Sequence, residues 1–224
     1  MGRLLLIRHG ESEGNRERVF TRHPEVPLTE QGRVQARAAA ERVRHEGFAP
    51  SAIVTSPYRR ALDTARIVAE ALALPVATEA DLRERHWGDL TGRPYGEARR
   101  GPGYDPQRYW EWRPPGRLGE TLDEVRRRAG AAVDRIAARA PAADVVVVSH
   151  GGVMTALWYH VTGEWRPGRV VDNAAIVVAE HDGGRWRGAR LVDVVGASLE
   201  LPPRPVGYSV GADRSSGDRD GGAG

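Results

Sequence analysis

Residues Leu4–Gly10 read Leu-Leu-Leu-Ile-Arg-His-Gly, an apolar run that ends in a cation, an imidazole and a glycine. An apolar run without alternation is typical of a strand covered on both faces, as in a parallel sheet. A second run of this kind, Val145–Val148, is followed by a serine, a histidine and two glycines at Ser149–Gly152. The two stretches predict central strands, each with a histidine at its carboxyl end.

Helical and extended segments alternate around these two runs. We expect Thr29, Ser56 and Thr121 to be the N-caps of three helices, the last through a capping box with Glu124. Strands that alternate with helices predict an α/β three-layer sandwich, with a mostly parallel central sheet and helices on both faces. The expected helices cover residues 29–46, 57–72, 121–139 and 152–161, and further strands cover 52–55 and a closing hairpin of 174–179 with 185–192.

The chain of 224 residues has the length of one α/β domain, which we assign to residues 1–201. Residues 86–119 are rich in Gly, Pro and Trp without a clear period, and we expect a lid-like excursion there. Residues 202–224 combine Pro, Gly, Ser and mixed charges. Such a composition buries too little apolar area to offset the entropy of ordering, so a disordered tail is expected.

Composition narrows the classes of protein. The absence of cysteine excludes disulfide scaffolds, cysteine nucleophiles and cysteine metal sites. The longest apolar runs are too short to cross a bilayer and the N-terminus lacks a signal-peptide layout, so we expect a cytoplasmic protein without a membrane partner. All 33 basic residues are arginines, nearly balanced by 30 acidic residues and without a basic run, so no nucleic-acid partner is expected. Nothing in the sequence indicates a homo-oligomer.

Reactive side chains follow three of the predicted strands. Arg8 and His9 end the first, Arg60 lies in the first turn after the strand at 52–55, and His150 ends the late strand. Ligands of such sheets bind beyond the carboxyl ends of the strands, so parallel neighbours would bring these groups into one pocket. The N-termini of the following helices also point there and favour an anion.

These groups suit phosphoryl transfer. A neutral imidazole such as that of His9 is a competent nucleophile toward phosphorus near neutral pH. Arg8 and Arg60 would bind the nonbridging oxygens, and His150 would donate a further hydrogen bond to the transferred group. The pattern predicts an anion pocket with a nucleophilic histidine.

A leaving alkoxide also needs an acid, and the chain offers Glu84 and His86 close together. The residues alone do not distinguish the two. No spacing of histidines and carboxylates indicates a metal site, and no glycine-rich loop is followed by lysine. We therefore expect neither a metal nor a cofactor.

Five stretches along the chain match one known series of motifs in the same order over roughly residues 3–195. They are Leu6–Asn15, Pro27–Ala36, Thr55–Ala65, Leu82–Glu84 and Val148–Gly152. This series resembles the signature of the histidine phosphatase superfamily, in its phosphoglycerate mutase-like branch. The resemblance implies an α/β sandwich that needs no metal and acts on small phosphate esters.

The resemblance also implies roles for individual residues. His9 matches the phosphorylated nucleophile, and Glu84 matches the proton donor, in preference to His86. Asn173 matches a structural position before a late strand. The remaining matches belong to the phosphate pocket: Arg8, Arg60 and His150, with Asn15 as a polar ligand and Gly151 where the backbone approaches the phosphoryl group.

Features of the resemblance favour a phosphatase over a mutase. Mutase-like members carry glycine where this chain has Arg22, and residues Trp112–Gly116 resemble the proline-glycine turn of the phosphatase subgroup. The lid region is also shorter than in mutases. We therefore predict a phosphomonoester phosphatase acting on small metabolites through a phosphohistidine. The alternatives are a 2,3-bisphosphoglycerate-dependent phosphoglycerate mutase and a non-catalytic phospholigand-binding protein.

Overall fold

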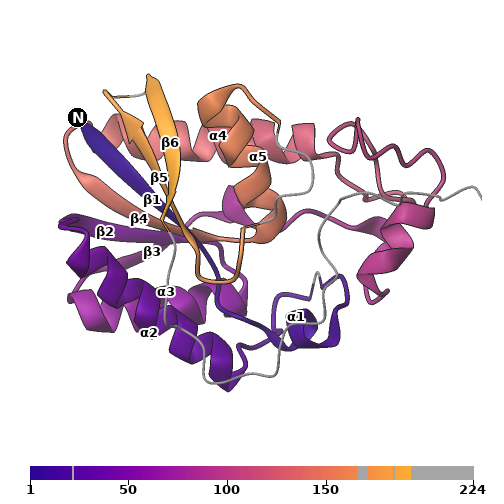
Figure 1. The fold of residues 1–224 in the computed structure, drawn as a ribbon, viewed down its shortest axis with the longest axis horizontal. Coiled ribbons are helices and arrows are strands. Elements are labelled where there is room, and N and C mark those ends of the chain that lie inside the picture. The colour runs from indigo at the N-terminus through magenta and orange to yellow at the C-terminus, as the bar shows by residue number, and fades with distance from the viewer. Residues whose placement is uncertain (22, 166–170, 184, 193–224) are drawn as a thin grey trace, which may run out of the picture.

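The computed structural model describes residues 1–21, 23–165, 171–183 and 185–192. Six strands form one sheet in the order β3-β2-β4-β1-β5-β6, as Figure 1 shows. Strands β3, β2, β4 and β1 run parallel, and β5 is antiparallel to both β1 and β6. The prediction of a mostly parallel sheet is confirmed. The strands are β1 (Gly2–Arg8), β2 (Pro50–Thr55), β3 (Val76–Thr78), β4 (Asp144–Ser149), β5 (Ile176–His181) and β6 (Trp186–Val192).

Helices cover both faces of the sheet, with α2 and α3 on one side and α4 and α5 on the other (Figure 1). This arrangement confirms the predicted three-layer sandwich. The α-helices are α1 (Glu13–Glu17), α2 (Glu30–His45), α3 (Arg59–Leu72), α4 (Leu122–Arg139) and α5 (Gly151–Thr162). Short 3-10 helices are η1 (Ala80–Leu82), η2 (Gly88–Leu90) and η3 (Tyr95–Arg100).

The apolar run of β1 is buried on both sides. Leu5 and Ile7 belong to the core beneath α2 and α3, whereas Leu4 and Leu6 belong to the core beneath α4 and α5. Because neither face of the strand meets water, every position takes an apolar side chain and no alternation appears. This packing fixes β1 at the centre of the sheet and holds its carboxyl end in a set position.

Two of the three predicted N-caps are confirmed. Thr29 accepts a hydrogen bond from the backbone N–H of Gly32, and Thr121 forms the capping box with Glu124. The prediction for Ser56 is wrong, because the helix begins only at Arg59. The Ser56 hydroxyl instead contacts the Nε2 atom of His150, at 2.7 Å. A short polar side chain at a strand end can use either kind of partner, and here a distant one prevails.

The predicted hairpin is confirmed as β5 and β6, although β5 starts two residues later than expected. Ala174 has a left-handed backbone (φ 60°), which ends regular pairing before Ile176. Residues 86–119 lie beyond the carboxyl ends of β1 and β4 (Figure 1) and contain irregular chain with η2 and η3. Their aromatic residues form a small core with Phe20. Both Arg22 and the predicted tail at 202–224 lie outside the described residues.

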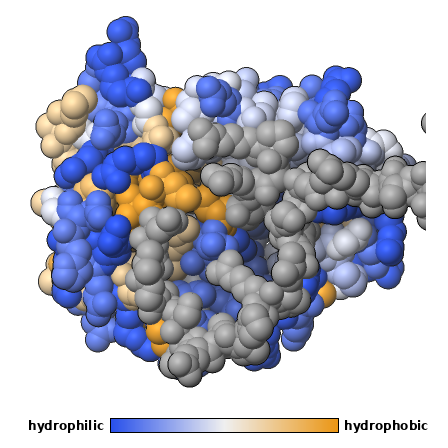
Figure 2. Space-filling view, viewed as in Figure 1, coloured by the Kyte–Doolittle hydropathy of each residue, from blue (hydrophilic) through white to orange (hydrophobic). Residues whose placement is uncertain are grey.

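The surface in view is mainly hydrophilic. Figure 2 shows hydrophobic residues gathered in one area of this face, near β5 and β6. Leu191 of β6 is among the few large apolar side chains that are exposed. Across the described ranges, no helix has both the length and the apolar character to cross a membrane.

Candidate active site

A cavity of about 380 Å³ lies at the carboxyl ends of the central strands. The predicted site residues that line it are Arg8, His9, Asn15, Arg60, Glu84 and Gly151. His150 lies behind His9, with ring centroids 5.1 Å apart and in edge contact. Residues far apart in the sequence therefore meet at one place, as their positions at three strand ends predicted.

The hydrogen bonds of His9 define its tautomer. Its Nδ1 atom lies 2.7 Å from the carbonyl oxygen of Gly10, and because a carbonyl only accepts, Nδ1 must carry the proton. In the neutral ring Nε2 then holds a lone pair, toward which Arg60 Nε donates at 3.3 Å. Burial first, and then the charges of Arg60 and Arg8, lower the pKa of His9 well below its ordinary value. His9 thus presents an unprotonated Nε2 beside a guanidinium.

Two arginines place buried positive charge around this nitrogen. Arg60 is 2% exposed and donates at 3.4 Å to the backbone oxygens of Thr21 and His23. Arg8 donates to the Val171 carbonyl, whereas its buried Nε finds no hydrogen-bond partner among the described residues. Burial lowers the pKa of both guanidiniums. Buried cations and unpaired donors are costly, so the pocket is suited to an anion that supplies the missing acceptors.

His150 is oriented by Ser56. The Ser56 hydroxyl receives the backbone N–H of Tyr58, which leaves its own hydrogen available for His150 Nε2. The other ring nitrogen, Nδ1, is buried and has no partner among the described residues. Burial, followed by the charge of Arg60, lowers the pKa of His150 well below its ordinary value. The ring is therefore neutral rather than a cation.

Asn15 is held by a network at the start of α1. Its Oδ1 accepts from Ser12 and from Asn173 Nδ2, the latter at 3.1 Å. Asn173 also donates to the His9 carbonyl at 3.0 Å, which ties the chain before β5 to the end of β1. The Asn15 amide nitrogen faces Tyr95 Oη at 3.0 Å. This amide is a fixed donor at the wall of the cavity.

Glu84 lines the cavity, whereas His86 is not among the described residues that do so. The Glu84 carboxylate accepts from the backbone N–H of Arg85 at 2.7 Å and from that of Gly152 at 3.4 Å. Arg128 of α4 fastens the surrounding chain, since it donates to the carbonyls of residues 81, 83 and 84. Placement thus favours Glu84 over His86 as the group that meets a ligand. Within the described ranges, no group of three or more His, Asp or Glu residues could hold a metal ion.

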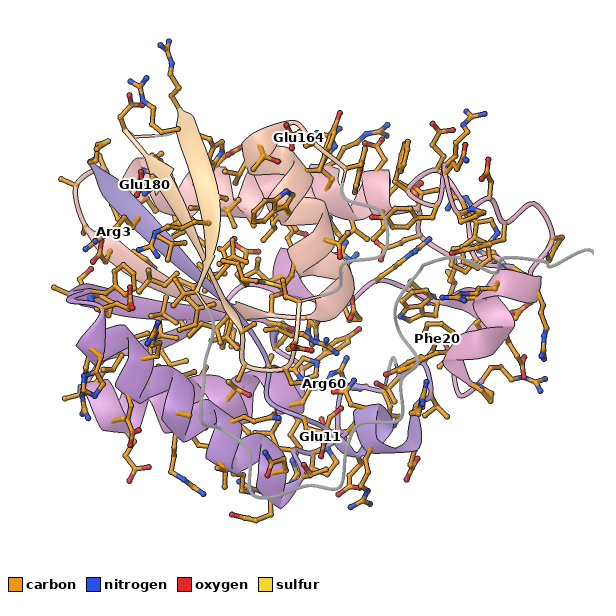
Figure 3. All side chains as sticks on the ribbon, in the orientation of Figure 1. Arg3, Glu11, Phe20, Arg60, Glu164 and Glu180 are labelled. Atoms are coloured by element: carbon orange, nitrogen blue, oxygen red, sulfur yellow. The ribbon has the colours of Figure 1, made fainter. Side chains whose placement is uncertain are left out.

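The rest of the cavity wall was not foreseen. Aromatic side chains from the N-terminal loop and residues 86–119 surround the side away from the sheet. In Figure 3, Phe20 lies on the side of these residues and Arg60 at the end of the sheet. The aromatic lining consists of Phe20, Trp87, Tyr95, Tyr104, Tyr109 and Trp112. Their concentration in an irregular segment was the available signal in the sequence.

Comparison with known proteins agrees with this geometry. A family model described as histidine phosphatase superfamily (branch 1) matches residues 4–194. The chain belongs to this superfamily. The superfamily includes phosphatases, so the chain is an enzyme of this class, as the sequence predicted.

Relatives within the superfamily carry both phosphatase and mutase names. Phosphoglycerate mutase-like protein 4 of Arabidopsis thaliana is 35% identical, covering 96% of this chain and 94% of that protein. The metal-independent phosphoserine phosphatase of Arabidopsis thaliana is 33% identical, over 82% of this chain and 78% of that protein. The structure of mycobacterial glucosyl-3-phosphoglycerate phosphatase with VO3 is 30% identical, with a TM-score of 0.73 over 84% of this chain and 96% of that one.

Proposed function

We propose that the chain is a metal-independent phosphomonoester phosphatase that acts through a phosphohistidine at His9. The observation that supports this most strongly is the state of that ring. The Gly10 carbonyl holds the proton on Nδ1, so Nε2 keeps its lone pair, which accepts from Arg60 Nε at the wall of a cavity that Arg8 also lines. An unprotonated nitrogen beside an anion pocket is the arrangement that nucleophilic attack on a phosphate ester requires.

In the first step of this mechanism, His9 Nε2 attacks phosphorus and the ester P–O bond breaks. The departing alkoxide takes a proton from Glu84, which acts as general acid. Arg8 and Arg60 neutralise the nonbridging oxygens, and the Nδ1–H of His150 donates to one of them. The Asn15 amide and the Gly151 N–H at the start of α5 add neutral donors.

In the second step, Glu84 removes a proton from a water molecule that attacks phosphorus. The P–N bond breaks, its electron pair returns to His9 Nε2, and inorganic phosphate leaves. The guanidiniums supply the positive charge that other phosphoryl-transfer enzymes obtain from metal ions. The name of the metal-independent phosphoserine phosphatase relative fits a cycle of this kind.

The test is release of inorganic phosphate from p-nitrophenyl phosphate in the presence of a metal chelator. We expect turnover by the native chain and a loss of about 10⁴-fold in His9→Gln, because the nucleophile is removed. His45→Gln, at an exposed histidine of α2, is the matched control and should retain full activity. Rapid quenching should also trap an acid-labile phosphoprotein that is absent from His9→Gln. Full activity of that variant would refute the mechanism.

Mutase activity is the second candidate, favoured by the name of the 35% identical relative. In a mutase the phosphohistidine excludes water and returns its phosphoryl group to another hydroxyl. Interconversion of 3- and 2-phosphoglycerate, stimulated by 2,3-bisphosphoglycerate and faster than phosphate release, would establish it. Failure to hydrolyse any ester and to trap phosphoprotein would instead indicate a non-catalytic phospholigand-binding protein.

A further inference from the structure

We infer that the substrates are phosphomonoesters whose alcohol part carries a flat apolar ring, an inference that rests on the proposed phosphatase function. The cavity of about 380 Å³ falls in the size range of whole small-molecule sites. The phosphoryl group would occupy the end at His9 and Arg60. The remaining volume must take the alcohol part of the ester, and its walls therefore determine which alcohols fit.

These walls are made of aromatic rings that already support one another. Phe20 lies 4.0 Å from Trp87 and 4.9 Å from Tyr95, measured between ring centroids. In the same cluster, Tyr104 and Trp112 meet edge to face at 5.2 Å. Because these rings are ordered by their own contacts, a ligand ring would add to them without the cost of ordering the wall.

Arg85 also lines the cavity, where it supports the aromatic wall. It is 3% exposed, and two of its three guanidinium nitrogens donate to the carbonyls of Glu120 at 2.7 Å and Trp112 at 2.6 Å. Its guanidinium lies over the rings of Trp87 and Trp112, at 4.8 and 5.6 Å from their centroids. The cation is thus fixed against two rings of the wall, and its hydrogen bonds to backbone carbonyls make it less available to a ligand anion.

Tyr109 extends the wall toward α5. Its ring contacts Trp110 and Trp165, with centroid distances of 5.7 and 6.3 Å. Burial raises the pKa of Tyr109 to about 12, so the phenol stays neutral at working pH. A neutral, braced ring suits an apolar group better than a second anionic group.

The competing possibility is an ester whose alcohol part carries a carboxylate, as phosphoglycerates do. Arg99 lines the cavity and would be its partner, but the acidic Asp172 and Glu84 line the same cavity. A small acid would also leave most of the aromatic surface in contact with water, which forfeits the apolar contact that the walls offer. The aromatic lining therefore favours the ring.

A matched pair of esters tests the inference. Phenylpropyl phosphate and propyl phosphate have equivalent primary-alkoxide leaving groups and differ in the ring alone. We expect kcat/KM to be about 10- to 100-fold higher for the phenyl ester, the range expected from burying one ring in an aromatic pocket. A ratio near one, or a preference for 3-phosphoglycerate over both esters, would overturn the inference. If no ester is hydrolysed, the proposed function itself fails.

Variants of the cavity wall show which side chains cause the preference for the phenyl ester. Trp87→Leu and Tyr109→Leu should each lower the phenyl-to-propyl ratio by about 5-fold or more, since each removes one aromatic face of the wall. Turnover of propyl phosphate reports that the variant is folded, so the ratio is interpretable even where total activity falls. Trp186→Leu changes an aromatic residue of β6 outside the cavity lining and should keep the native ratio. A native ratio in both wall variants would contradict the inference.

Discussion

Replacing Gly152 with alanine should impair Glu84, the proposed acid, without removing it. A Cβ atom at position 152 would lie 2.7 Å from Glu84 Oε1, whereas ordinary contact begins near 3.4 Å. The carboxylate would have to retreat by about 0.7 Å to relieve the overlap. A displacement of about 1 Å at a reacting group can lower the rate by about 100-fold. We therefore expect a loss of about 10- to 100-fold in kcat/KM for an alkyl phosphate.

The choice of substrate separates this effect from general damage. A p-nitrophenolate departs without help from an acid, so p-nitrophenyl phosphate should lose less than about 3-fold in the same variant. Gly152 lies in the first turn of α5, where alanine is favoured over glycine by up to about 1 kcal/mol. The midpoint of thermal unfolding should accordingly not fall. Gly188→Ala, where the added Cβ meets no atom within 4 Å, is the control.

Two results would refute this reasoning. Equal losses on the alkyl and nitrophenyl esters would mean that the substitution disturbs the phosphate pocket and not the acid. An undiminished rate on the alkyl ester would mean that the position of Glu84 does not matter, and the proposed acid would then be wrong.

Three further predictions concern residues around the site and in the core. Arg128→Gln should lower kcat for an alkyl phosphate, because the substitution removes the hydrogen bond that holds the chain at Glu84. It should also lower the free energy of unfolding by about 3 kcal/mol in thermal unfolding, because the half-buried ion pair with Glu120 is broken. Arg3→Ala should cost about 1–3 kcal/mol at neutral pH in denaturant unfolding, because Asp144, 7% exposed, loses hydrogen bonds of 2.7 and 2.6 Å. Because the pKa of His9 is lowered, its neutral form persists into acid, and the acid limb of kcat/KM should lie well below pH 6.5.

The sign of the Asp144 effect gives a second check. Burial alone would raise the pKa of this carboxyl, but hydrogen bonds from Arg3 and from the Ala49 N–H outweigh it and the net pKa is lowered. The stabilisation is therefore present above the ordinary value of 3.8 and disappears as pH falls through the lowered pKa. The difference between native chain and Arg3→Ala should shrink below about pH 4. A difference that grows in acid would contradict this origin.

Exposed arginines supply controls for the two stability predictions. Arg127 is 68% exposed and pairs with Asp123, and Arg187 is 52% exposed and pairs with Asp182. Exposed pairs of this kind contribute about 0–1 kcal/mol, so Arg127→Gln and Arg187→Ala should change the free energy of unfolding little.

For the pH prediction, an acid limb of kcat/KM at or above pH 6.5 would contradict the buried, neutral state of His9.

The central strands and the cavity end at His9 could be predicted because both follow from short stretches of sequence. The apolar runs of β1 and β4 are buried on both faces, so sequence and burial agree residue by residue. The rule that ligands bind beyond the carboxyl ends of parallel strands then brought His9, Arg60 and His150 together. The ring distance of 5.1 Å between the two histidines bears out that expectation.

The unpredicted parts depend on contacts between residues far apart in the sequence. Ser56 has the local chemistry of an N-cap, yet its partner His150 follows 94 positions later. Arg85 would ordinarily be exposed, but the carbonyls of Glu120 and Trp112 enclose it. Trp112 and Glu120 both lie outside helices and strands, where the sequence has no hydrophobic periodicity that would predict which side chains are buried. Hydrophobic periodicity therefore does not predict the residues of the aromatic cavity wall.

The two ends of the cavity differ in how they are supported. His9 and His150 follow strands whose side chains are buried on both faces, and their neutral rings tolerate close approach to each other and to Arg60. The aromatic end is held by its own small core around Phe20 and Trp112, separate from the two cores that flank the sheet. The two ends still touch where Tyr95 of the wall contacts the Asn15 amide, so we expect substitutions at the other rings of the wall to leave His9 in place. Under the proposed function, this separation of supports would let one phosphoryl-transfer centre serve alcohols of different shape.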